Sequence, residues 1–143
     1  MSRRPLPDTI VEPTLERPGT GLFDRSHIPH SKVLQALRLV DISGAPQAVS
    51  EWRIEDQGEP GLGGRPAMLD DRAMFSLLLM VATEWEPMHL TRVASIITHR
   101  LSDDSKIALG ITTASATEAE WYARSWRAFH RISVVVDPFP ITR

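Results

Sequence analysis

The sequence predicts an all-α protein, a compact bundle of about four to six helices with an extended proline-rich amino-terminal arm. Apolar residues recur at helical spacing in several segments after residue 30, and capping residues precede several of these segments. Five of the eleven prolines lie in the first 29 residues, where each fixes φ and removes a backbone donor. With 143 residues, 42% of them hydrophobic, the chain is long enough to form a core without disulfides or metal.

The composition divides the chain into four segments. Residues 1–30 form the proline-rich arm, whose second half is expected to be tethered by Leu15, Leu22, Phe23 and Ile28. Residues 31–57 form a short helical segment. Residues 58–68 form a linker rich in glycine and proline, and residues 69–143 form a helical core domain.

Two helices are expected before the linker. Ser31 is a plausible N-cap for a helix that reaches about Val40, with an apolar stripe at helical spacing. A second short helix is expected from about Gln47 to Glu55, with Trp52 as the residue most expected to be buried.

The segment after the linker is densely helical. Asp70 is expected to cap a helix that reaches about Trp85, and its stretch 77–82 is apolar on all sides, which is typical of a central, buried helix. A further helix is expected over about residues 89–101. Ser102 then reads as the N-cap of a short helix that ends at Gly110.

The last helix has the clearest local signals. Thr117 and Glu120 form a capping box, in which each satisfies a backbone donor of the other. Asp137-Pro138 marks the end of the helix. Four residues recur at helical spacing and are expected to form its core face: Tyr122, Trp126, Phe129 and Ile132.

The residue types argue against a self-sufficient active site. The chain has no cysteine, which excludes disulfides, thiolate zinc sites and cysteine nucleophiles. Its five histidines contain no i, i+4 pair of the kind that often binds catalytic zinc. The acid pairs Asp70-Asp71 and Asp103-Asp104 stand at helix starts, where capping explains them. We therefore expect no enzyme activity, no cofactor, no metal and no small-molecule substrate.

A cytoplasmic location, away from membranes, is the default expectation. The amino terminus lacks the apolar stretch of a secretory signal. The longest apolar run, residues 77–82, is far shorter than the roughly 20 residues that a bilayer-spanning helix needs.

Arginines supply the candidate binding residues. Arg124, Arg127 and Arg131 lie at i, i+3 and i+7 on the last helix, a spacing that suits a row of DNA phosphates but is equally typical of a solvated helix face. Arg65, in Gly64-Arg65-Pro66, is a candidate for the DNA minor groove, although acidic residues upstream favour a plain linker. Residues 89–109 could also form a helix-turn-helix. Its second helix would then present Asp103-Asp104 to the DNA major groove, where acidic residues are poor readers of base edges.

Three stretches carry a resemblance to a known family. These are Gly64-Arg65-Pro66 before the apolar helix, Leu109-Gly110 at a helix end, and Trp126-Arg127-Ala128-Phe129-His130-Arg131-Ile132 before the proline-rich exit. Residues 63–140 together resemble the amino-terminal helical region of actinobacterial transposases. The resemblance implies a DNA-associated region that precedes a metal-dependent acidic catalytic core. The sequence ends at Arg143, where that core would begin, so no catalytic residue is carried over.

Two hypotheses follow. The first is a non-catalytic, transposase-like module for DNA binding or an accessory role in transposition, with DNA, a second copy or a full-length transposase as partner. The second is a protein–protein interaction or dimerisation domain with no nucleic-acid ligand, whose partner packs on the helix at residues 31–40 or on the arm. The net charge of −2 favours the second hypothesis, because nucleic-acid-binding domains usually carry a basic excess.

Overall fold

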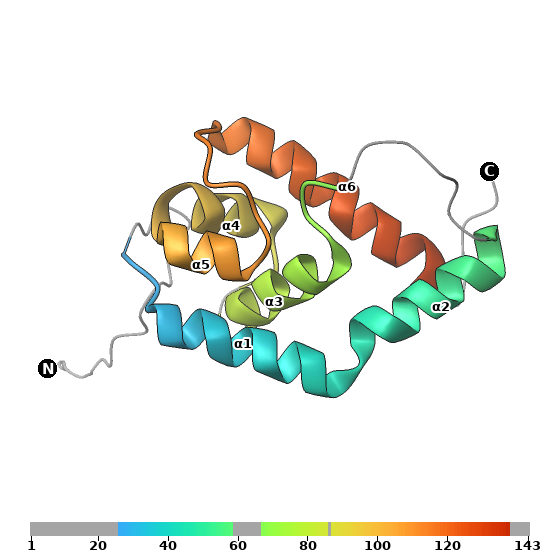
Figure 1. Ribbon diagram of the computed structural model, residues 1–143. Helices are drawn as coiled ribbons and strands as arrows, with labels where there is room; N and C mark the ends of the chain where they lie inside the picture. Colours follow the sequence, from blue (N-terminus) through green and yellow to red (C-terminus); the bar gives the residue numbers. More distant parts are fainter. Residues whose placement is uncertain (1–25, 59–66, 86, 138–143) are drawn as a thin grey trace, which may run out of the picture.

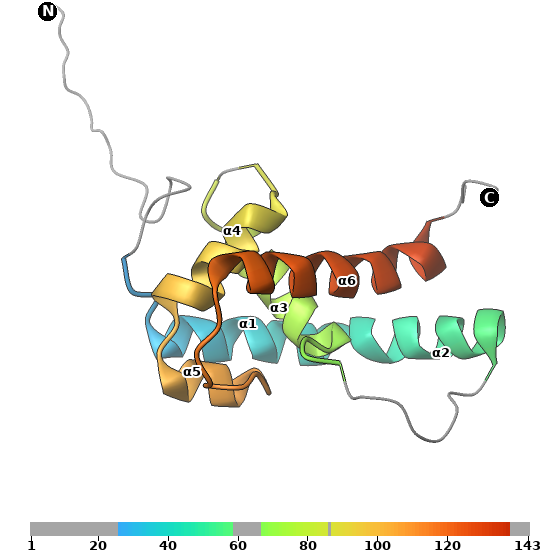
Figure 2. The ribbon, with the colours of Figure 1, turned by 90° about the horizontal axis from the view of Figure 1, so that it is seen from above.

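The computed structural model describes residues 26–58, 67–85 and 87–137, and every regular element within these residues is a helix. The helices pack into a compact bundle (Figures 1 and 2), which confirms the predicted all-α fold. The rest of the arm and most of the linker lie outside the described residues. The elements are α1 (His30–Ser43), α2 (Ala45–Gln57), α3 (Asp71–Ala82), α4 (Leu90–Ser95), the π-helix η1 (Ile96–Arg100), α5 (Asp103–Ala108) and α6 (Glu118–Val136).

Helices α1 and α2 meet at an elbow. Gly44 ends α1 in the left-handed region at φ 72°, a conformation that glycine adopts without steric strain. Both helices are longer than the sequence pattern predicted. The expectation that Trp52 is buried was wrong, since it is exposed and Val49 is the buried residue of α2. Packing against α3 and α6 determines the inward face of α2, and this contact is invisible in a short local pattern.

Helix α3 is the central element, as expected. The carboxylate of Asp70 accepts a hydrogen bond from the Ala73 N–H at 2.8 Å, which confirms the predicted cap. Helix α3 contacts α1, α2, α4 and α6, and Leu77 is fully buried. The helix ends at Ala82 rather than Trp85, because the chain turns there and Trp85 adopts a φ of 64°.

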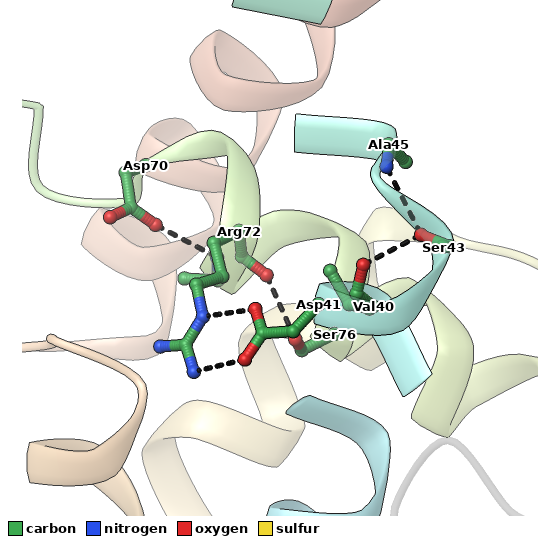
Figure 3. A network of polar contacts seen from close by, with 8 residues as sticks. Val40, Asp41, Ser43, Ala45, Asp70, Arg72 and Ser76 are labelled. Carbon is green, nitrogen blue, oxygen red and sulfur yellow. Dashed lines mark hydrogen bonds and ion pairs between the residues drawn. The ribbon is translucent and has the colours of Figure 1, made fainter. Parts of the chain in front are cut away.

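An exposed ion pair joins the end of α1 to the start of α3 (Figure 3). Arg72 donates from Nε and Nη2 to the two carboxylate oxygens of Asp41, at 2.8 and 2.9 Å. The hydrogen bond from Arg72 lowers the pKa of Asp41. Because both side chains are well exposed, the pair contributes little to the stability of the fold.

The helix predicted for residues 89–101 consists of α4 followed by the π-helical turn η1. Ser102 then caps α5 by accepting a hydrogen bond from the Ser105 N–H at 3.2 Å, as predicted. Gly110 lies beyond the end of α5 in the left-handed region at φ 76°. A short connection leads from there to α6.

A buried ion pair links the α3–α4 connection to η1. Arg100 donates from Nη2 and Nη1 to the Glu84 carboxylate at 2.7 and 3.1 Å, and from Nε to the Ser26 carbonyl at 2.8 Å. The side chains of Arg100 and Glu84 are only 6% and 7% exposed. This pair also anchors the end of the arm on the helical body.

One hydrophobic core unites helices from both sides of the linker. It includes residues of α1 and α2 together with residues of α3, α4, η1 and α6. In the part of the chain that the structure describes, no helix is long and apolar enough to cross a membrane. The large, fully buried side chains of this core include Val33, Val49, Leu77, Val93, Ile97 and Trp121.

Candidate functional site on the outer face of α6

The position of α6 is set at its amino terminus by the predicted capping box. The Thr117 hydroxyl accepts from the Glu120 N–H at 3.1 Å, and the Glu120 carboxylate accepts from the Thr117 N–H at 2.8 Å. The hydrogen bond that the Thr117 N–H donates to the carboxylate lowers the pKa of Glu120. The cap therefore fixes where the helix begins.

The inward face of α6 is not the one that the aromatic spacing predicted. The buried residues are Trp121, Ser125, Ala128 and Ile132. The prediction of a core face with Tyr122, Trp126 and Phe129 was therefore wrong, although its fourth member, Ile132, is buried. The small side chains at positions 125 and 128 allow α6 to pack closely on the helices beneath it, which larger rings there would prevent. The three rings are instead 41%, 50% and 42% exposed.

These rings, Tyr122, Trp126 and Phe129, form a stripe that we call the aromatic face. The indole of Trp126 stacks on the His130 imidazole, with ring centroids 5.0 Å apart and an interplanar angle of 13°. The stack holds two exposed rings in a defined arrangement, so part of the aromatic face is preorganised for a ligand. The sequence contained the alternative register at 121, 125, 128 and 132, but its two small members gave it a weaker apolar signal.

The three candidate arginines have different surroundings. Arg124 lies over the Trp121 ring with its guanidinium carbon 4.6 Å from the ring centroid, and its buried Nη1 has no hydrogen-bond partner. Arg131 donates to the Leu69 carbonyl and is partly buried. Arg127 is exposed beside the aromatic face. Thus only Arg127 presents its guanidinium freely to a ligand, and the prediction that all three contact phosphates stays a prediction.

The remaining candidate features lie elsewhere. Arg65 is outside the described residues. Asp103 and Asp104 are exposed in the first turn of α5. Near the carboxyl end of α6, a depression of about 320 Å³ is lined by Val135 and Val136 and by two acids of α2, Glu55 and Asp56. These acids would repel a phosphate backbone at that end of the helix.

The candidate site is the exposed outer face of one helix. Among the residues that the structure describes, no group of three or more histidines and acids could hold a metal ion. Comparison of the chain with protein-family models, curated proteins and solved structures found no match. The likeness to transposases therefore stays a prediction from the residues quoted above.

Proposed function

We propose that this protein is a non-catalytic dimerisation module, in which the aromatic face of α6 packs on the same face of a second copy. The observation that carries this proposal is the exposure of three aromatic rings in one stripe on a helix whose other face is in the core. The capping box and the buried Trp121 hold the helix in place. The stripe is thus a fixed surface and not a loose segment.

The residue types of the aromatic face are those of a protein interface. Tyrosine, tryptophan, phenylalanine and arginine are enriched at the centres of such interfaces. Covering the exposed half of each ring contributes about 1 kcal/mol from apolar burial alone. Arg127 and His130 at the edge of the stripe supply donors for its rim.

A second copy suits the position of the stripe along the helix. Helix α6 has 19 residues, a length of roughly 28 Å, and Trp126 lies near its middle. An antiparallel pair of α6 helices related by a twofold axis at this residue would place rings against rings.

The oligomeric state of the purified chain tests the proposal. We expect sedimentation equilibrium to show a concentration-dependent dimer. The substitutions W126A and F129A should each raise the dissociation constant of this dimer by about 30-fold, the effect expected for loss of a hot-spot residue. I107A is the matched control, since Ile107 is an exposed apolar residue of α5. A wild-type chain that remains monomeric up to millimolar concentration would refute the proposal.

DNA binding by the same surface is the second candidate function. The exposed guanidinium of Arg127 beside the stacked Trp126 and His130 rings favours it, because nucleic-acid sites combine cations with aromatic platforms. The resemblance to transposases supports it as well. Against it stand the engagement of Arg131 by the Leu69 carbonyl and the acids at the end of the helix.

Fluorescence anisotropy with mixed genomic DNA fragments at ~50 and ~200 mM salt tests this candidate. Binding through a few phosphates should weaken by about tenfold or more between the two concentrations. R127E should abolish binding, whereas R38E, the same charge reversal at an exposed position of α1, should not. Equal affinities of R127E and R38E for DNA would show that Arg127 does not contact the DNA. If the wild type bound no DNA at either salt concentration, DNA binding would be refuted as a function.

A further inference from the structure

An apolar groove runs between α1 and α3, away from α6. It consists of two depressions of about 110 and 460 Å³ that share Leu39 and Leu79 in their walls. Apolar side chains of α3 and Met88 line most of the larger depression. The smaller one ends at the polar side chains of Lys32, Gln35 and Thr83. The groove is therefore continuous and has one polar end.

The groove exists because residues 77–82 of α3 are apolar on all sides, while the neighbouring helices do not cover all of this stretch. Phe75, Leu78 and Leu79 remain only partly buried against the core. On the groove's other side, Leu39 and Met88 are each 51% exposed. An exposed apolar groove of this kind has the character of surfaces that bind apolar segments.

The arm joins the helical body close to the polar end of the groove. The Ser26 carbonyl accepts a hydrogen bond from Arg100, and Arg100 pairs with Glu84, the residue that follows Thr83 of the groove wall. The Ile28 N–H donates to the Arg100 carbonyl at 3.0 Å, and the Ile28 side chain is buried. Ser26 and Ile28 are thus anchored beside the polar end of the groove.

The length and composition of the arm match the groove. Residues 15–23, which lie outside the described residues, read Leu-Glu-Arg-Pro-Gly-Thr-Gly-Leu-Phe. Nine extended residues span about 30 Å. The groove wall on α1 runs from Lys32 to Ser43, about 17 Å along the helix axis. An extended segment with apolar residues at both ends therefore has ample length.

We propose that residues 15–23 bind in the groove between α1 and α3 of their own chain, with Leu22 and Phe23 in contact with Leu39, Leu79 and Met88. The tether at Ser26 favours this occupant over any untethered one, since a short link gives a local concentration in the millimolar range. The proposal is independent of dimerisation through α6.

A spin label at the polar end of the groove tests the proposal in the full-length chain. The chain has no cysteine, so K32C carries one label at an exposed rim position. We expect this label to broaden the amide signals of residues 15–23 in the NMR spectrum of the same chain, independently of concentration. The same label at E51C, an exposed position on α2, is the matched control and should leave these signals sharp.

The outcomes separate the possible occupants. L22D with F23D should restore sharp signals in the K32C-labelled chain while the rest of the spectrum stays unchanged. Sharp signals in the labelled chain without these substitutions would overturn the proposal. The last outcome comes from a mixture of two chains, one with the spin label but no NMR isotopes and one with the isotopes but no spin label. Broadening in this mixture would assign the groove to a second copy, and would also overturn the proposal.

Discussion

E84A is expected to lower the free energy of unfolding by about 3–5 kcal/mol, because it leaves the guanidinium of Arg100 buried without its counter-charge. The two side chains are 6% and 7% exposed, so water cannot replace the lost carboxylate. Three parts of the chain meet at this pair: the end of the arm, the α3–α4 connection and η1. The substitution should therefore destabilise the whole fold rather than one segment of it.

Urea denaturation followed by circular dichroism measures this loss of free energy, and thermal denaturation should show a fall in Tm on the order of 10 °C. R72A is the matched control, because it breaks an equally well-formed Arg–carboxylate pair whose side chains are 41% and 49% exposed. R72A should lower the free energy of unfolding far less than E84A, because water reaches both groups of this exposed pair. Similar losses for the two variants would show that burial does not determine the strength of the Glu84–Arg100 pair.

The double variant E84L/R100L separates the charge from the packing. Replacement of both members of a buried pair by apolar residues of similar size is often neutral, so this variant should recover part of the stability lost in E84A. The recovery will be incomplete, since the Ser26 carbonyl also loses its donor. A double variant less stable than E84A would mean that the pair stabilises the fold beyond the avoidance of a buried charge.

The features that the sequence predicted correctly are those with local causes. The caps at Asp70, Ser102 and Thr117 each depend on residues within three positions of one another. The central place of α3 follows from its apolar stretch at residues 77–82. By contrast, the Glu84–Arg100 pair joins residues 16 positions apart, and the groove between α1 and α3 depends on how two helices cross. No local pattern encodes either feature.

The same distinction explains the candidate site. The sequence correctly indicated that α6 carries arginines and aromatic rings, but a helix with apolar residues in two adjacent registers can bury either one. Only tertiary contacts decide between them. They bury Trp121 and hold Arg131 on the Leu69 carbonyl, which leaves Arg127 and the aromatic face outside. Arg124 lies over the Trp121 ring one turn away on the same helix.

W121A is expected to destabilise the fold by about 3–5 kcal/mol, the usual range for deletion of a large buried aromatic side chain. Trp121 is 2% exposed, and its ring also carries the stacked Arg124 guanidinium. The substitution removes both the packing and the cation–π contact. It should lower the midpoint of urea denaturation sharply.

W126A is the matched comparison on the same helix, five residues away. Trp126 is 50% exposed, so its removal should change the stability of the monomer by less than about 1 kcal/mol. Both variants are measured at a protein concentration low enough to exclude dimers, because association would stabilise the wild type by mass action. The reverse order of effects would mean that Tyr122, Trp126 and Phe129 form the core face after all, and the binding surface proposed for α6 would then not exist.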